Sequence, residues 1–245
     1  MSLNSNRTTT GPRVIAVGVG PGDPELVTLK GARLLGEADV VITPVGDKGD
    51  GSIARAIVAG LVDPARQEIV EQVFPMRRDR AGLAEIRRAS ARMMAAHVAA
   101  GRTVAFVTLG DPFLYSTFLY VYHYLREEFP ATPVEVVSGV SSIHAAAARA
   151  DLPLGLADER IAILPATFED DRLRRALADF DTVVLMKVFR VFAQVRELLR
   201  ELDLLAGAVY LKRVGLPDET VVTDLDQVRD DDLDYLSLII VKKIR

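Results

Sequence analysis

The stretch of sequence that decides the fold is T-V-A-F-V-T-L-G-D-P-F-L-Y-S-T-F-L-Y, residues 103–120. Val104 to Val107 form a short apolar run, which is typical of a strand buried on both faces of a parallel sheet. Gly110 allows close backbone approach, Asp111 supplies a carboxylate, and Pro112 presets φ for a turn into a helix. Ligands bind at the carboxyl ends of strands in open α/β sheets, so this turn is a candidate site. A plain strand-to-helix connection is the alternative interpretation of G-D-P.

The first half of the chain alternates strands and helices, which indicates an α/β domain with a mostly parallel sheet and flanking helices. We expect strands at 14–17, 40–43, 68–74 and 104–107, and helices at 26–35, 53–61, 83–100 and 113–128. On the last helix, Tyr120 and Tyr124 share one side, which predicts packing against the sheet. Residues 1–11 are polar and patternless, which predicts a disordered leader.

The loop after the first strand is G-V-G-P-G-D-P, residues 18–24. A dinucleotide fingerprint would be G-x-G-x-x-G, but Asp23 stands in place of the last glycine, which argues against a Rossmann site. Asp23 is instead a predicted N-cap, with Pro24 at the first helical position.

Two prolines within 127–133 end the first alternation and predict a domain boundary, giving domains 12–130 and 131–245. In the second domain we expect strands at 134–137, 160–164, 182–186, 207–211, 220–224 and 236–243, with helices at 142–150, 170–178 and 189–203. The last three strands have no helical pattern between them, which favours a mixed α+β sheet. The predicted fold class is therefore a two-domain α/β protein.

Composition narrows the functional class. The chain has 245 residues, 49% of them hydrophobic and 26% charged, with a formal net charge of −4. It contains no cysteine, which excludes disulfides, thiolate metal sites and a cysteine nucleophile. The charge gives no support to a nucleic-acid partner, and the sequence shows neither a membrane-spanning run nor a signal peptide. We expect a cytoplasmic protein.

Several familiar catalytic patterns are missing. The three histidines, His97, His123 and His144, have no metal-ligand spacing, so no protein-bound metal is expected. No G-x-S-x-G elbow and no P-loop occur. Methyl transfer from a sulfonium donor is compatible with this pattern, because the donor is already activated and the protein mainly aligns two reactants.

Three further groups of residues have two interpretations each. Arg77, Arg78 and Arg80 lie between elements and suit either a solvated surface or contact with a polyanion. The turn S-G-V-S-S at 138–142 is either a helix cap or a set of donors and acceptors for a ligand. Tyr115 sits within the turn at 109–117 and is the tyrosine we expect to touch a ligand.

The motifs together resemble the tetrapyrrole methylase family. They are V-G-V-G-P-G-D-P-E-L-V-T-L-K-G-A at 17–32, L-G-D-P-F-L-Y-S-T at 109–117 and G-V-S-S at 139–142. Within the family, I-L-P-A-T-F-E-D at 163–170, V-V-L-M-K-V at 183–188, R-V-G at 213–215 and D-Y-L-S-L-I-I-V-K-K at 234–243 look like the enzymes that methylate C-20 of precorrin-2 or cobalt-factor II.

This resemblance implies a homodimer that uses S-adenosylmethionine, bound in a cleft between the two domains, to methylate a tetrapyrrole. Carried over by position, the residues implied around the donor are Pro21, Leu109, Gly110, Asp111, Leu114, Ser141, Ser142, Met186, Arg213, Val214 and Gly215. The substrate carries eight carboxylates, which would give Arg77, Arg78 and Arg80 a role as substrate contacts. Tyr115, from its place at the turn, is the candidate catalytic side chain.

Two positions depart from the family pattern. Uroporphyrinogen methylases have an aspartate resembling a general base where this chain has Pro44, which argues against uroporphyrinogen as substrate and leaves no carried-over base. Ser138 stands where relatives commonly have proline, so the geometry of the Ser141 turn is open. Methylation at another ring carbon, a ligand-sensing protein without turnover, and a nicotinamide dehydrogenase are the alternatives. The sequence leaves metal-free and cobalt-loaded substrates equally open.

Overall fold

The structure is a computed structural model that describes residues 11–46, 51–75, 80–166 and 170–243. The side chains of Arg80, Ala81 and Asp170 are outside this description. The chain divides into two compact units, Met1–Ser141 and Ser142–Arg245. Of the predicted leader, residues 1–10 lie outside the described residues.

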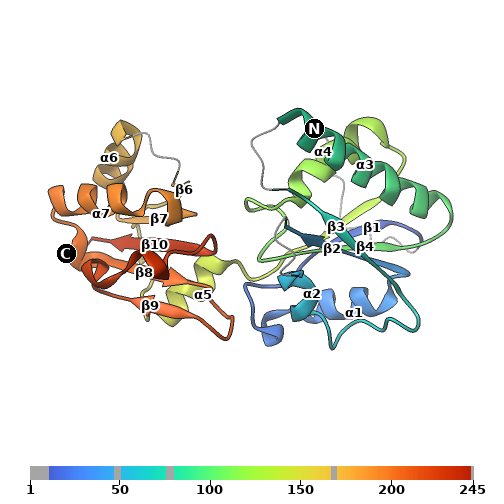
Figure 1. The fold of residues 1–245 in the computed structure, drawn as a ribbon, viewed down its shortest axis with the longest axis horizontal. Coiled ribbons are helices and arrows are strands. Elements are labelled where there is room, and N and C mark those ends of the chain that lie inside the picture. The colour runs from blue at the N-terminus through green and yellow to red at the C-terminus, as the bar shows by residue number, and fades with distance from the viewer. Residues whose placement is uncertain (1–10, 47–50, 76–79, 167–169, 244–245) are drawn as a thin grey trace. The chain divides into compact units, whose positions relative to one another are not determined.

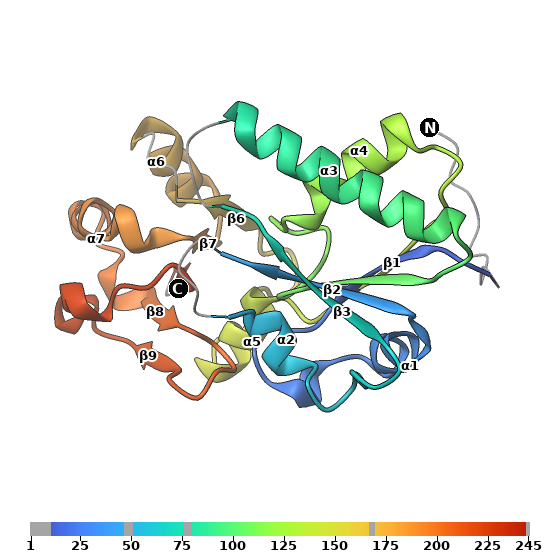
Figure 2. The same ribbon diagram turned by 45° about the vertical axis from the view of Figure 1, so that its right-hand side comes forward.

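The first unit is built on a parallel five-stranded sheet with the order β3-β2-β4-β1-β5. Its strands are β1 (Val14–Gly18), β2 (Val40–Val45), β3 (Glu68–Val73), β4 (Val104–Thr108) and β5 (Val134–Val137). The helices are α1 (Leu29–Glu37), α2 (Ile53–Ile57), α3 (Arg80–Ala99) and α4 (Phe118–Glu128). Helices α1 and α2 cover one face of the sheet, and α3 and α4 cover the other (Figures 1 and 2). The predicted parallel sheet with flanking helices is confirmed.

The central strands β1 and β4 are buried along their whole length. Their side chains alternate between two apolar cores, because successive residues of a strand point to opposite faces. Phe106 and its neighbours at even positions pack with α3 and α4, whereas Val107 and its neighbours at odd positions of the two strands pack with α1 and α2. Both faces are therefore filled with hydrocarbon, and only the strand ends can present groups to a ligand.

The helix after β4 begins at Phe118, not at the predicted residue 113. Residues 111–117 form an irregular turn, in which Tyr115 has a φ of 52°. A non-glycine residue in this left-handed region interrupts a right-handed helix, which is why α4 starts later.

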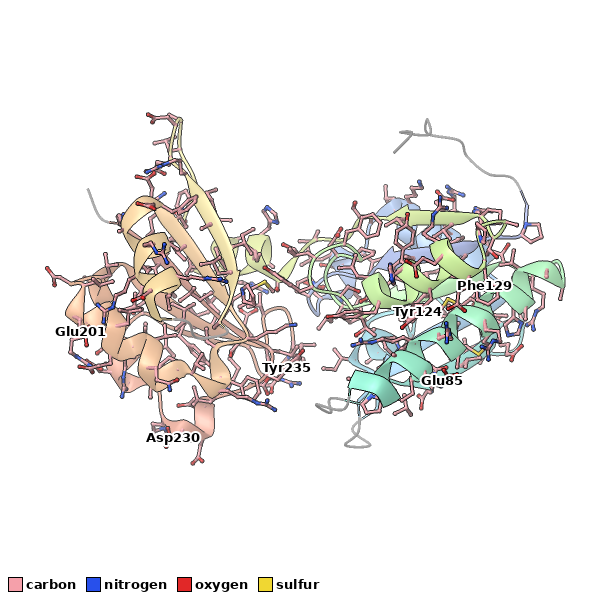
Figure 3. The ribbon with its side chains drawn as sticks, turned by 90° about the horizontal axis from the view of Figure 1, so that it is seen from above. Glu85, Tyr124, Phe129, Glu201, Asp230 and Tyr235 are labelled. Atoms are coloured by element: carbon pink, nitrogen blue, oxygen red, sulfur yellow. The ribbon has the colours of Figure 1, made fainter. Side chains whose placement is uncertain are left out.

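The prediction that Tyr120 packs against the sheet is wrong. The buried face of α4 carries Phe118, Val121 and Leu125, while Tyr120 is 52% exposed and lies under the guanidinium of Arg87, 3.7 Å from its ring centroid. Tyr124, labelled on α4 in Figure 3, packs at the margin of the core that α4 shares with α3.

The loop between β1 and α1 contains a separate short turn. The predicted cap at Asp23 is confirmed, since its carboxylate accepts a hydrogen bond from the Glu25 N–H at 2.9 Å. The turn that it caps is a 3₁₀-helix, Pro24–Leu26, and α1 begins only at Leu29, capped by the Thr28 hydroxyl.

The second unit contains a mixed five-stranded sheet with the order β6-β7-β10-β8-β9, in which β6 and β7 are parallel and the other pairs antiparallel. Its strands are β6 (Ile161–Pro165), β7 (Thr182–Met186), β8 (Ala208–Lys212), β9 (Thr220–Val222) and β10 (Ser237–Lys242). Its helices are α5 (Ser142–Arg149), α6 (Asp170–Asp179) and α7 (Phe192–Glu201). Helices α6 and α7 pack on one face (Figure 1), around the fully buried Tyr210. The predicted mixed sheet is confirmed.

The boundary between the units lies after Ser141, whereas the sequence pattern placed it between residues 130 and 131. Strand β5 accounts for the difference, because it pairs in parallel with β1 and so belongs to the first sheet. The proline-containing segment before β5 is therefore a connection within the first unit.

Candidate functional site

The loops that follow β1 and β4 leave the centre of the first sheet in opposite directions. From β1 the chain passes through α1 on one face to β2, and from β4 it passes through α4 on the other face to β5 (Figure 1). Because β1 and β4 are neighbours, their carboxyl ends form a topological switch point, which is where open α/β sheets bind ligands. The candidate site of the first unit therefore comprises the loops 18–24, 109–117 and 138–141.

Glycines bring the backbones of these three loops into direct contact. A Cβ atom on Gly139 would lie 2.2 Å from the carbonyl oxygen of Gly110 and 2.6 Å from the carbonyl carbon of Gly18. A Cβ atom on Gly18 would lie 2.6 Å from that same oxygen. The N–H of Gly110 also donates to the Gly20 carbonyl at 2.7 Å. The packing therefore requires that residues 18 and 139 have no side chain.

Gly110 and Ser141, both predicted donor contacts, are brought together. Gly110 has a φ of 68°, and a Cβ atom placed on it would lie 4.0 Å from the Cα of Ser141, an ordinary van der Waals contact. The position beside Gly110 can therefore accommodate a carbon atom next to the Ser141 backbone. Ser142 follows directly as the first residue of α5.

The carboxylate of Asp111 accepts two backbone hydrogen bonds. One oxygen accepts a hydrogen bond from the Phe113 N–H at 2.8 Å, and the other accepts one from the Gly139 N–H at 3.0 Å. The side chain of Asp111 therefore connects the loop 109–117 to the loop 138–141.

The apolar residues predicted at the site lie on two of the three loops. Leu109 packs at the margin of the core shared with α1 and α2, and Leu114 is half-buried. Pro21 is buried and lies next to Gly20, which has a φ of 78°. Pro21 can shape the glycine-rich loop, and its burial limits direct contact with a ligand.

Tyr115 projects from the most strained part of the turn after β4. Its φ of 52° is unfavourable for a tyrosine, and its side chain is 41% exposed. The next residue anchors it, because the buried Ser116 hydroxyl lies 2.9 Å from the Thr108 hydroxyl and accepts the Phe118 N–H at 3.0 Å. Nothing in the sequence pattern singled out this Thr108–Ser116 pair, although both hydroxyls flank the G-D-P turn.

In the second unit, Met186 and the segment Arg213–Gly215 lie at one end of the sheet. Strands β7 and β8 flank β10 and run antiparallel to it, so their carboxyl ends both adjoin the start of β10. The N–H groups of Lys187 and Arg213 donate to the carbonyls of Ser237 and Leu236, at 3.0 and 2.8 Å. Lys187 and Arg213 have left-handed φ values of 62° and 53°. Such strained backbone clusters at ligand sites.

The guanidinium of Arg213 is already engaged by carboxylates. It lies 2.6 Å from Asp218 and 3.6 Å from Asp234, and the hydrogen bond with Asp218 is the main reason that the pKa of Arg213 is raised. Val214 is buried, and the Gly215 N–H donates to Glu219 at 2.6 Å. A ligand at this turn would therefore meet backbone atoms more readily than the Arg213 side chain.

The structure does not place the other predicted groups at this site. Arg77 and Arg78 lie outside the described residues, as does the side chain of Arg80, the first residue of α3. Pro44 occupies the carboxyl-terminal part of β2, the position for which the resemblance to uroporphyrinogen methylases would imply an aspartate. Among the described residues, no group of three or more His, Asp or Glu side chains is placed to hold a metal ion.

The described helices also include none that is long and apolar enough to cross a membrane.

Residues 13–229 match the family model of the tetrapyrrole (corrin/porphyrin) methylases. The chain belongs to this family, which confirms the resemblance seen in its motifs.

Particular relatives are similar over almost the whole chain. The chain is 36% identical to a precorrin-2 C(20)-methyltransferase from Sinorhizobium sp, covering 94% of both proteins. It is also 36% identical to a cobalt-precorrin-2 C(20)-methyltransferase from Salmonella typhimurium, covering 94% of this chain and 96% of the relative. Among solved structures, a uroporphyrin-III C-methyltransferase from Thermus thermophilus complexed with S-adenosylhomocysteine is 27% identical, with a TM-score of 0.66 and coverage of 94% of this chain and 97% of that one.

Proposed function

We propose that the protein transfers the methyl group of S-adenosylmethionine to C-20 of precorrin-2 or of its cobalt-loaded form in cobalamin biosynthesis. The observation that carries this proposal is the 36% identity to C(20)-methyltransferases over 94% of the chain. The switch-point site supports it, because methyl transfer needs two reactants held in line more than it needs strong acids or bases.

The residues of the site fit a donor that is held largely by peptide groups. We propose that Leu109, Gly110 and Leu114 hold the amino-acid portion and sulfonium region of the donor, beside the loop that Pro21 shapes, and that Asp111 supports this part of the site through the two loops that its carboxylate joins. The position beside Gly110, which accommodates a carbon atom in van der Waals contact with Ser141, supports this assignment. We propose Ser141, Ser142, Met186 and Arg213–Gly215 as contacts of the adenosine end. When bound, S-adenosylmethionine supplies a methyl group already activated on a cationic sulfur.

The substrate side requires positive charge, because the tetrapyrrole carries eight carboxylates and the chain itself has a net charge of −4. We propose Arg77, Arg78 and Arg80 as contacts of these carboxylates, since guanidinium groups bind carboxylates bidentately. We also propose that the protein works as a cytoplasmic homodimer, without a nucleic-acid or membrane partner. Sedimentation equilibrium of the purified protein measures the oligomeric state, and a monomer would contradict the homodimer.

Tyr115 is the proposed catalytic side chain, because a strained backbone presents it from the turn that we assign to the donor. Tyr115→Phe is expected to lower kcat about tenfold, a modest share of what a positioned proton donor or acceptor contributes. The affinity for S-adenosylhomocysteine, measured by calorimetry, should stay within about twofold of wild type. An unchanged turnover rate would remove the hydroxyl from the mechanism.

Parallel assays with precorrin-2 and with its cobalt-loaded form test the proposed function. Mass analysis and NMR of the product should show one methyl group added at C-20, with one S-adenosylhomocysteine formed for each, and the preferred macrocycle should have the higher kcat/KM. A methyl group at another carbon would identify a different tetrapyrrole methylase. Donor binding without any methylated product would instead indicate a sensing protein.

A further inference from the structure

The carboxylate of Asp111 joins two loops whose strands are not neighbours. Its Oδ1 atom accepts the Phe113 N–H within the loop after β4, and its Oδ2 atom accepts the Gly139 N–H in the loop after β5. In the sheet, β1 lies between β4 and β5. The Asp111 side chain therefore connects the loop after the edge strand β5 to the loop after the central strand β4, across the carboxyl end of β1.

The hydrogen bond from Gly139 to Asp111 fixes the orientation of Gly139, because packing contacts alone have no preferred direction. Gly139 packs against the backbones of Gly18 and Gly110 and has no side chain of its own to fix its orientation. Its strand, β5, lies at the edge of the sheet and pairs with β1. Hydrogen bonds between an ionised carboxylate and N–H groups are shorter and stronger than neutral ones, so Asp111 is well suited to hold the loop in place.

We propose that Asp111 is a positioning residue for the methyl donor, which sets the spacing between the Gly110 backbone and Ser141. This inference deepens the proposed function and depends on it, since it concerns the same donor site. Both oxygens of the carboxylate accept backbone N–H groups, so the side chain acts on the donor through the shape of the two loops.

The Asp111→Asn variant can keep only one of the two bonds. Its single amide oxygen accepts either the Phe113 or the Gly139 N–H, and its NH₂ group then faces the other N–H, to which it cannot bond. Asp111→Ser is a second variant, because a serine hydroxyl can still cap the local turn but is too short to reach Gly139.

Asp63→Asn is the matched control. Asp63 makes the same local bond, accepting the Ala65 N–H at 3.0 Å, and the substitution removes the same charge. Asp63 precedes β3 and so lies at the amino ends of the parallel strands, whereas the candidate site lies at their carboxyl ends. Its substitution should leave donor binding within about twofold of wild type.

Two ligands separate positioning from direct contact. S-adenosylhomocysteine has the amino-acid portion of the donor, whereas 5′-methylthioadenosine lacks it. If Asp111 acts by positioning, Asp111→Asn and Asp111→Ser should weaken both ligands by a similar factor of about ten in calorimetry. A loss confined to S-adenosylhomocysteine would overturn the inference, because it would show direct contact with the amino-acid portion. Unchanged affinity for both ligands would also overturn it.

Hydrogen exchange of the ligand-free protein provides a readout that needs no turnover. The Gly139 amide should exchange faster in Asp111→Ser than in wild type, because the serine hydroxyl cannot reach it, while amides of the buried strand β4 keep their protection. Unchanged protection of Gly139 would overturn the inference. If wild type binds S-adenosylhomocysteine but methylates no tetrapyrrole, the proposed function fails, while binding and exchange still decide the role of Asp111.

Discussion

A Gly139→Ala variant is expected to lose measurable donor binding and to be destabilised by about 3 kcal/mol or more, the upper range for overpacking a tightly packed site. The added methyl group would lie 2.2 Å from the Gly110 carbonyl oxygen and within 2.7 Å of the Gly18 backbone. These neighbours are main-chain atoms of β1 and of the turn after β4, so they cannot move aside as a flexible side chain can. Urea unfolding and calorimetry with S-adenosylhomocysteine measure the two effects.

Gly36→Ala is the control for this substitution. Gly36 lies in α1, and a Cβ atom placed there meets no heavy atom within 4 Å. Since alanine favours helix more than glycine does, this variant should be more stable by about 0.5 to 1 kcal/mol and should bind the donor normally. Wild-type affinity in Gly139→Ala would contradict the rigid packing of the three loops.

The sheets were predictable from sequence because their strands carry strong local patterns. The run Val104 to Val107 is apolar on both faces, and the structure buries every residue of β4. The mixed second sheet follows from strands at 207–211, 220–224 and 236–243 without intervening helices, and β8, β9 and β10 occupy these places. The helix start at Phe118 was missed, because the left-handed φ of Tyr115 depends on how Ser116 is anchored to Thr108.

The sequence identified some residues of the candidate site but not the contacts that hold its loops together. Its motifs drew attention to Gly110, Asp111 and Ser141, and the structure of the first unit brings these residues together. The need for glycine at 18 and 139 was hidden, because it arises from contacts among three loops that are far apart in the chain. The pairing of β5 with β1 was hidden for the same reason, since it too is a long-range contact.

Protonation of Glu135 is expected to destabilise the first unit in acid. This carboxylate on β5 lies 2.9 Å from Arg13 and 2.7 Å from Lys30, and its side chain is only 11% exposed. Burial alone would raise the pKa of Glu135, but the hydrogen bonds from Lys30 and Arg13 outweigh burial and lower it below its ordinary value of 4.5. The ion pairs therefore favour the charged form in the folded protein.

The sign of the pH dependence follows from this lowered pKa. The stabilisation by Glu135 is fully present above its unfolded-state pKa, near 4.5, and is lost as the pH falls through the lower pKa of the folded state. At neutral pH, Glu135→Gln should reduce the free energy of unfolding by about 3 kcal/mol, because it leaves the largely buried Arg13 without its carboxylate. In urea unfolding, the difference between wild type and variant should shrink below about pH 4.5.

Glu37→Gln is the matched control, since Glu37 forms an exposed pair with Arg33 on α1, with side chains 51% and 55% exposed. It should change the free energy of unfolding by less than about 0.5 kcal/mol at any of these pH values. An equal loss in the two variants, or a difference for Glu135→Gln that persists unchanged in acid, would contradict the assignment.

Glu135 also bears on donor binding, because β5 leads directly into the loop that contains Gly139. Its ion pairs fix β5 to Arg13, which precedes β1, and to Lys30 on α1, so they act at the strand while Asp111 acts at the loop. If both restraints position Gly139, Glu135→Gln should weaken S-adenosylhomocysteine binding about threefold at neutral pH, a smaller loss than for Asp111→Asn. Unchanged affinity would mean that the pairing with β1 and the Asp111 carboxylate suffice, and that the Glu135 ion pairs serve stability alone.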